Sequence, residues 1–140
     1  MVIMAIDLGK ARTGLAVCDK KEILASPIGT IHEKDDEKLI MEILKKINFY
    51  SPEILVIGLP KNMDGSLGES AIRAQNFAES LKQKINIPII LWDERRTTIS
   101  AHNYLNATNV RGKKRKNVID TLSATIILEN YMQFRKSQVK

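Results

Sequence analysis

Three acidic residues lie at the ends of apolar runs or inside one, and they are the first candidates for chemistry. Asp7 closes the run "VIMAID", Glu94 follows "IPIILWD", and Asp120 lies within "NVIDTLSATII". Carboxylates brought together raise one another's pKa, and a divalent cation relieves their repulsion. Mg²⁺ takes oxygen ligands and keeps several waters, which leaves positions for phosphate oxygens. If the three acids converge, they predict a site for Mg²⁺, or Mn²⁺, that serves phosphodiester hydrolysis.

Basic residues accompany these acids and favour a polyanionic partner. The net charge is +6 and the pI is about 9.5. The segment "RGKKRK", residues 111–116, is basic at five of its six positions. Bases that hold phosphates around acids that hold a metal would describe a nuclease. The candidate nucleic-acid contacts are Lys10, Arg12, Lys61, Asn62, Arg95, Arg111, Lys113, Lys114, Arg115 and Lys116.

Each candidate also has a plainer structural interpretation. A basic run such as residues 111–116 is often only a solvated loop. Asn117 could cap the last helix, and Asp120 would then be a first-turn acid favoured by the helix dipole. Arg95 could pair with an acid or contact phosphate. Asp93 should point away from its neighbour Glu94 on an extended chain, which favours a structural role for it.

Five apolar runs predict the strands that must position these residues. The runs are residues 2–9, 13–19, 22–31, 53–59 and 87–92. The first run and the last two lack polar alternation, which indicates strands buried on both faces. Short polar links join the first three runs, and such links favour antiparallel pairing. Ligands bind at the carboxyl ends of parallel strands, so Asp7, the loop from Gly58 to Gly65 and residues 93–95 should share one edge of the sheet.

Helices should connect and cover these strands. Helical spacing of apolar residues predicts helices over residues 35–51, 67–85, from 98 to between 106 and 109, and 117–134. Ser66 and Glu69 have the spacing of a capping box. Helical crossovers imply parallel neighbours. The sequence thus predicts an α/β fold, a mixed five-stranded sheet with three antiparallel and then two parallel strands and helices on both faces. We expect one domain over residues 1–140, frayed from about residue 135.

Cysteine usage and hydropathy bear on the compartment. Cys18 is the single cysteine and lies in an apolar run, so it should be a small buried residue. No apolar run approaches the roughly 18 residues of a membrane span, and the N-terminus lacks the basic region of a signal peptide. These features favour a reducing cytoplasm. The sequence marks no dimer face, so a monomer and a homodimer both stay open.

Four blocks of the chain carry a resemblance to a known family. They are "MAIDLGKARTGLAV", "ILVIGLPKNMDGS", "DERRTT" and "KNVIDTLSATIILENY", in this order across residues 3–132. Together they resemble the YqgF family of Holliday-junction-resolvase-like proteins. The resemblance implies a ribonuclease H-like sheet and a nuclease that processes the 5′ end of pre-16S ribosomal RNA. It also implies that Asp7, Glu94 and Asp120 are the catalytic acids.

The main expectation is therefore a metal-dependent nuclease that acts on structured nucleic acid in ribosome biogenesis. One alternative is a Holliday junction resolvase in DNA recombination, and another is a non-catalytic nucleic-acid-binding assembly factor. The segment "DLGKARTG" also resembles the first phosphate loop of actin-like phosphotransferases. Those enzymes close two domains around ATP, and 140 residues supply only one.

Overall fold

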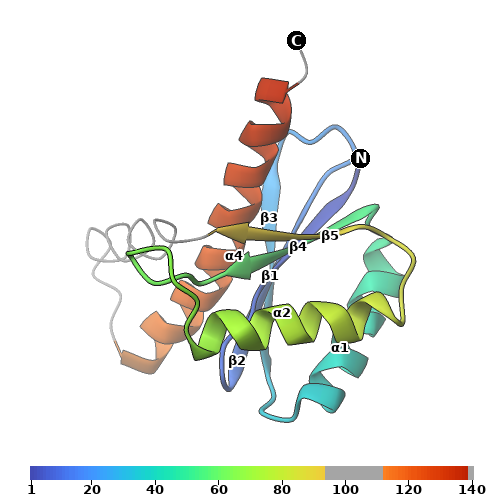
Figure 1. The fold of residues 1–140 in the computed structure, drawn as a ribbon. Coiled ribbons are helices and arrows are strands. Elements are labelled where there is room, and N and C mark those ends of the chain that lie inside the picture. The colour runs from blue at the N-terminus through green and yellow to red at the C-terminus, as the bar shows by residue number, and fades with distance from the viewer. Residues whose placement is uncertain (94–111, 139–140) are drawn as a thin grey trace.

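The core of the fold is a mixed five-stranded sheet (Figure 1). The computed structural model describes residues 1–93 and 112–138, with the backbone alone for residues 112–121. The strand order is β3-β2-β1-β4-β5, with β1 antiparallel to β2, β2 antiparallel to β3, and β1, β4 and β5 parallel. The predicted sheet is confirmed. The strands are β1 (Ile3–Asp7), β2 (Arg12–Cys18), β3 (Ala25–His32), β4 (Ile54–Leu59) and β5 (Ile89–Asp93).

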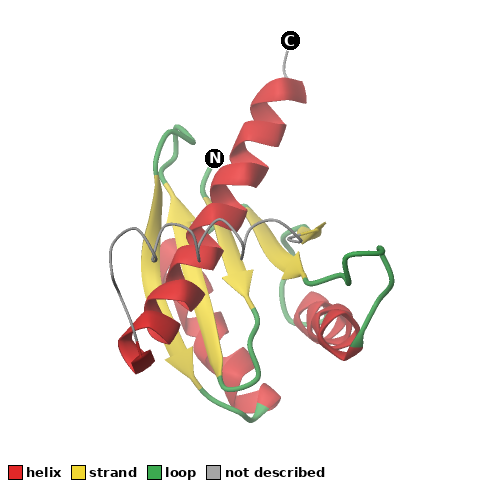
Figure 2. Ribbon diagram, turned by 90° about the vertical axis from the view of Figure 1, so that its left-hand side faces the viewer, coloured by secondary structure: helices red, strands yellow, loops and turns green. Residues whose placement is uncertain are grey.

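Helices cover both faces of this sheet, as predicted. They are α1 (Asp36–Tyr50), α2 (Glu69–Lys82) and α4 (Gly112–Gln138). Figure 2 shows α4 across one face, with α1 and α2 on the opposite face. The Asp35 side chain caps α1 by accepting hydrogen bonds from two backbone amides of the first turn. The predicted helix between residues 98 and 109 lies outside the described residues.

The alternation of side chains along β1 divides the interior into two cores. Met4 and Ile6 face α1 and α2, while Ile3 and Ala5 face α4. All four are fully buried, which explains why this strand shows no polar alternation in the sequence. The α4 core also includes Val56, Ala124, Ile127, Leu128, Tyr131 and Met132.

The predicted start of the second helix and its predicted cap are both corrected by the structure. Helix α2 begins at Glu69 with Gly68 as its N-cap, and no side chain caps it. The predicted capping box is wrong because the Ser66 hydroxyl is hydrogen-bonded to Asp64 and to the Asn62 amide instead. Leu67, which we assigned to the buried helical face, is 43% exposed. The segment therefore forms a turn whose polar side chains bond to one another.

The predicted third strand also begins three residues later than expected. Glu22 has a positive φ of 55°, and the Asp19 carboxylate accepts hydrogen bonds from the amides of Ile23 and Leu24. This side-chain-capped turn uses the backbone donors that a strand would need. The β2–β3 link is therefore longer than the hydrophobic pattern predicts, and β3 starts at Ala25.

The basic run before the last helix is helical and is not the loop we predicted. Helix α4 begins at Gly112, so residues 112–116 form its first turns and only Arg111 lies outside the described residues. Lysine and arginine have high helix propensity, and no proline interrupts the run. Asn117 is consequently not an N-cap, and Asp120 lies in the third turn of the helix. The interpretation of Asp120 as a first-turn acid is wrong.

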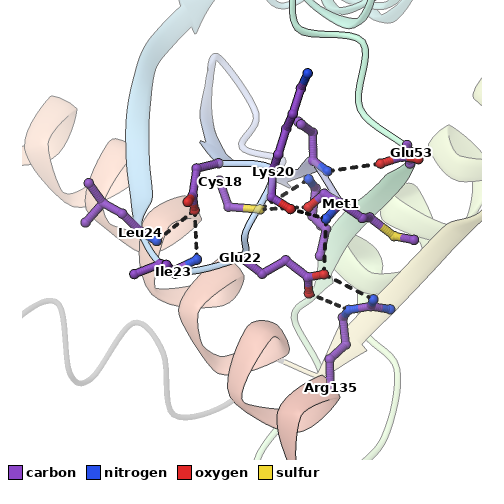
Figure 3. A network of polar contacts seen from close by, with 11 residues as sticks. Met1, Cys18, Lys20, Glu22, Ile23, Leu24, Glu53 and Arg135 are labelled. Carbon is purple, nitrogen blue, oxygen red and sulfur yellow. Dashed lines mark hydrogen bonds and ion pairs between the residues drawn. The ribbon is translucent and has the colours of Figure 1, made fainter. Parts of the chain in front are cut away.

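Helix α4 continues past residue 135, where the sequence predicted a frayed end, and its C-terminal part is bonded to Glu22 of the β2–β3 link. Arg135 donates a hydrogen bond from Nε to the Glu22 carboxylate at 2.8 Å, and the N-terminal ammonium lies 3.3 Å from the same carboxylate (Figure 3). The Arg135 hydrogen bond holds the pKa of Glu22 below its ordinary value. Helix α4 continues to Gln138. Within the described residues, no helix is long and apolar enough to cross a membrane.

Candidate active site at the carboxyl ends of the central strands

Asp7 is the last residue of β1 and ends a run of four buried side chains. It pairs with Gly14 of β2, and its side chain is partly buried. Because Ile3 and Ala5 face α4, strand alternation places the Asp7 carboxylate on the α4 face of the sheet. Asp7 therefore places a carboxylate at the edge of the core that α4 covers.

The parallel strands β4 and β5 end at the same edge as β1. Ile6 is in register with Ile57, and Ile57 is in register with Leu91. Leu59 pairs with Asp93 at the far end of the two strands. This shared edge is the one on which the sequence predicted the site. Glu94 and Arg95 follow Asp93 in the sequence and are outside the described residues.

Asp93 points to the opposite face from Asp7. Ile90 and Trp92 pack against the α4 core, so the alternate residues Leu91 and Asp93 project toward the α2 side. A metal site built around Asp7 on the α4 face would not include this side chain. The geometry agrees with the structural role that the sequence favoured for Asp93.

Asp120 lies on a helix that packs against the same face as Asp7. Its side chain is outside the described part of the structure, but its backbone belongs to α4. Ala124 and Ile127, four and seven residues later, are fully buried against the sheet. Positions three, four and seven apart share one side of a helix. Position 120 therefore belongs to the stripe of α4 that faces the sheet.

The β1–β2 turn carries the nearest candidate phosphate contacts. Lys10 is exposed in this turn, and Arg12 begins β2. A Cβ added to Gly9 would lie 2.1 Å from the Arg12 carbonyl oxygen, so only glycine fits the close approach of the two backbones. The turn is thus tightly folded immediately after Asp7, and it directs Lys10 outward from the same edge.

The β4–α2 loop carries Lys61 and Asn62, the other candidate phosphate contacts among the described side chains. The Asn62 side chain donates to the Ser66 hydroxyl at 3.0 Å, and its backbone amide donates to the Ser66 carbonyl at 2.9 Å. These bonds shape the loop. Lys61 is partly buried beside the end of β4. The loop lies at the edge predicted from strand direction, and Asn62 already has a structural role in it.

Sequence reasoning missed Arg73, which reaches this edge from α2. Its Nη1 donates to the Gly9 carbonyl at 2.6 Å, and its Nη2 lies 2.7 Å from the Asp36 carboxylate. A small pocket of about 150 Å³ opens beside the contact, lined by Leu8, Gly9, Lys10, Glu69, Ser70 and Arg73. Arg73 and Gly9 are 64 positions apart in the sequence, so no local sequence pattern predicts their contact.

The donor set predicted for a metal suits a hard cation. Asp7, Glu94 and Asp120 offer only carboxylate oxygens, the ligand type that Mg²⁺ and Mn²⁺ prefer. Across the described side chains, no group of three histidine, cysteine, aspartate or glutamate residues is placed to hold a metal. Only Asp7 of the three predicted ligands has a described side chain. The three carboxylates fit such a cation chemically. A complete metal site would require Glu94 and Asp120 beside Asp7.

The family follows from comparison with known proteins. A family model described as "RuvX: Holliday junction resolvase" matches residues 1–134. This chain belongs to the RuvX family. The family membership agrees with the resemblance found in the sequence, and the four quoted blocks all lie within the matched residues.

Several full-length relatives of this RuvX-family chain share a name. The protein from Caldanaerobacter subterraneus subsp. tengcongensis is 41% identical over 98% of this chain and 99% of its own length, and it is named "Putative pre-16S rRNA nuclease". The protein from Thermoanaerobacter pseudethanolicus, with the same name, is 40% identical over 99% of this chain and 100% of its own length.

Solved structures similar to this RuvX-family chain share its ribonuclease H-like fold. Thermus thermophilus RuvC superposes with a TM-score of 0.60 at 13% identity, over 98% of this chain and 97% of RuvC. The Holliday junction resolvase of fowlpox virus gives a TM-score of 0.56 at 11% identity, over 96% of this chain and 99% of the resolvase. The predicted fold class is confirmed.

Proposed function

We propose that this RuvX-family chain is a metal-dependent nuclease that hydrolyses phosphodiester bonds at the 5′ end of pre-16S ribosomal RNA. Relatives of the same length that are named as nucleases of that RNA support the substrate. The net charge of +6 favours binding to a nucleic acid, which is a polyanion. Ribosome biogenesis would place the protein in the cytoplasm, the compartment that a single unpaired cysteine also favours.

The observation that carries this proposal is the antiparallel course of α4 along β1 (Figure 1). Arg135 lies beside Met1 because both groups bind Glu22. From Met1 to Asp7 the strand advances about 20 Å, at about 3.3 Å per residue. From Arg135 back to Asp120 the helix advances about 22 Å, at 1.5 Å per residue. These lengths support the proposal that the two aspartates come level with each other on the same face of the sheet.

In this proposal, each residue has a defined role. Asp7, Glu94 and Asp120 would hold one or two Mg²⁺ or Mn²⁺ ions through their carboxylate oxygens. The metal would polarise the scissile phosphate and stabilise the charge that develops in hydrolysis. Basic residues would hold the flanking phosphates and bring the scissile bond to the acids. These residues are Lys10, Arg12 and Lys61 at the sheet edge, Arg95 shortly after β5 in the sequence, and Arg111, Lys113, Lys114, Arg115 and Lys116 before Asp120.

A Holliday junction is the second candidate substrate. The fold neighbours support it, since T. thermophilus RuvC is known in complex with a Holliday junction and superposes with a TM-score of 0.59. That likeness, at 13% identity, concerns the fold. The full-length relatives are far more similar and bear the ribosomal name, so we favour precursor RNA. A third candidate, a non-catalytic assembly factor, would bind the RNA without cutting it.

One experiment separates these possibilities. The purified protein is incubated with a precursor carrying the 5′ end of 16S ribosomal RNA, and separately with a four-way DNA junction. Each substrate is tested with Mg²⁺, with Mn²⁺ and with EDTA. We expect metal-dependent cleavage of the RNA, and its loss in Asp7→Asn, which keeps the size of the side chain but removes its charge.

The matched control is Asp19→Asn at the opposite end of β2. Its amide oxygen can still accept the turn hydrogen bonds of Ile23 and Leu24, so cleavage should persist. Cleavage in EDTA, or full activity of Asp7→Asn, would contradict the metal site. Cleavage of the junction but not of the RNA would favour the alternative that the protein is a Holliday junction resolvase. RNA binding without any cleavage would favour the assembly factor.

A further inference from the structure

We infer that Arg73 is a positioning residue of the proposed metal site, because it fixes the β1–β2 turn that follows Asp7. This inference rests on the proposed function and deepens it. Arg73 belongs to α2, which covers the face of the sheet opposite α4. It therefore does not approach the proposed metal site from the side of α4. It acts through the backbone that carries Asp7 and Lys10.

The guanidinium of Arg73 joins three segments of the chain. One nitrogen donates to the Gly9 carbonyl at 2.6 Å, within a partly buried contact, and another binds the first residue of α1, Asp36, at 2.7 Å. A planar guanidinium offers several donors in fixed directions, so one side chain can bind both groups at once. The β1–β2 turn is thereby tied to both helices of the opposite face.

The turn itself has little freedom once Arg73 is bound. The Ala11 carbonyl accepts a hydrogen bond from the Glu33 amide at 3.0 Å, and Leu8 packs against the α1 and α2 core. Gly9 lies too close to the Arg12 carbonyl to admit a side chain. Arg73 adds a further attachment by donating a hydrogen bond to the Gly9 carbonyl. Asp7 is two residues away, so movement of this turn is passed directly to the carboxylate.

The contact is better explained by positioning than by stability alone. The Asp36 side chain is 49% exposed, and ion pairs at such exposed sites stabilise a fold only weakly. The bond to the Gly9 carbonyl, by contrast, acts on the segment between two candidate functional residues. Groups that hydrogen-bond directly to metal ligands typically change metal affinity or activity by about 10–100-fold when removed. Arg73 acts one step further out, through the backbone, so its effect should lie near the lower end of that range.

The test compares Arg73→Ala, Arg73→Lys and Asp36→Ala in the full-length protein. The first removes both bonds, the second keeps a single cation, and the third removes only the ion pair. The Mg²⁺ concentration that gives half-maximal cleavage is measured together with kcat, KM and the melting temperature. Lys82→Ala, which removes an exposed cation at the far end of α2, is the matched control.

We expect Arg73→Ala to raise the half-maximal Mg²⁺ concentration and lower kcat, each by roughly tenfold, with KM much less changed. Arg73→Lys should recover part of the loss, while Asp36→Ala and Lys82→Ala should behave as the parent. An unchanged metal requirement in Arg73→Ala, whatever its melting temperature, would overturn the inference. An equal loss in Asp36→Ala would also overturn it, because the ion pair would then be the cause.

A readout that needs no cleavage separates this inference from the proposed function. Amide hydrogen exchange of residues 8–12 reports the stability of the turn directly. Arg73→Ala should speed exchange there, and the control should not. If the parent cuts neither substrate, the proposed function fails, and the role in positioning an active site fails with it. If the parent cuts but turn exchange is unaffected by Arg73→Ala, only the inference about Arg73 fails.

Discussion

Glu22 is the residue whose ionisation should couple stability to pH. It accepts a hydrogen bond from Arg135 and lies beside the N-terminal ammonium (Figure 3). Its side chain is 20% exposed and that of Arg135 is 30% exposed, so solvent screens the pair only in part. The Arg135 bond lowers the pKa of Glu22, and partial burial opposes that change. The folded protein therefore favours the charged carboxylate.

We predict that Glu22→Gln lowers the free energy of unfolding by roughly 1 kcal/mol at pH 7. Because the folded pKa is the lower one, the charged group stabilises the fold fully above its ordinary pKa of about 4.3. The contribution disappears as the pH falls through the folded pKa. Urea unfolding at several pH values should show parent and variant converging in acid.

The control for this prediction is Glu42→Gln on α1, which removes an exposed pair with Lys45. Its effect on the free energy of unfolding should stay below about 0.5 kcal/mol. A gap between the parent and Glu22→Gln that stays constant down to pH 2 would mean that packing, rather than charge, accounts for the contact.

Among the elements, the first turns of α4 hold the densest group of basic residues in the proposed RNA interface. They contain Lys113, Lys114 and Lys116 in helical backbone. Alanine is the best helix former, so alanine substitutions should keep the helix and remove only charge. The triple variant should bind RNA more weakly across all sequences. Each lost phosphate contact should reduce the slope of log affinity against log salt by about 0.7 to 0.9.

A charge-matched control for the basic run comes from the opposite face of the sheet. Replacing Lys38, Lys45 and Lys82 with alanine removes three positive charges from α1 and α2, where all three side chains are exposed. Salt titrations of binding should show the smaller slope only for the α4 variant, with circular dichroism confirming the helix in both. Equal slopes for the two variants would mean that only overall charge matters.

The whole molecule is organised as two cores that share the central strands. Leu39 of α1 belongs to one core and Ile127 of α4 to the other, and both are fully buried. Leu39→Ala and Ile127→Ala should each lower the free energy of unfolding by about 2–5 kcal/mol. Because β1 and β4 present side chains to both cores, loss of either core should unfold the whole sheet.

Urea unfolding followed by two probes tests this coupling. Trp92, the single tryptophan, packs against Tyr131 and Phe134 and reports the α4 core. Far-UV circular dichroism reports all helices. The two transitions should coincide in the parent and in both variants. Met41→Ala, at an exposed position of α1, should change stability by under about 0.5 kcal/mol. Separate transitions in Leu39→Ala would show that the two cores unfold independently.

The sequence by itself determined the sheet and the edge at which β1, β4 and β5 end, where the site is proposed. β1 and β4 are covered on both faces, so they appear in the sequence as unbroken apolar runs. The same pattern predicted burial on both faces for β5, and that prediction is wrong, because β5 is an edge strand with partly buried and exposed side chains. Short links marked the antiparallel side, and helical crossovers marked the parallel side. Asp7 could be placed at the end of β1 for the same reason, because the apolar run stops at that residue.

Only the tertiary structure decided how that edge is supported and where α4 begins. A run of charged residues has the same local pattern in a solvated loop and in an exposed helix, so residues 112–116 could not be assigned from periodicity. Ser66 could cap a helix or close a turn, and its bonds to Asp64 and Asn62 decide for the turn. The contact between Arg73 and Gly9 depends on how α2 packs beside β1. Local sequence patterns cannot predict such contacts, because the contacting residues lie far apart along the chain.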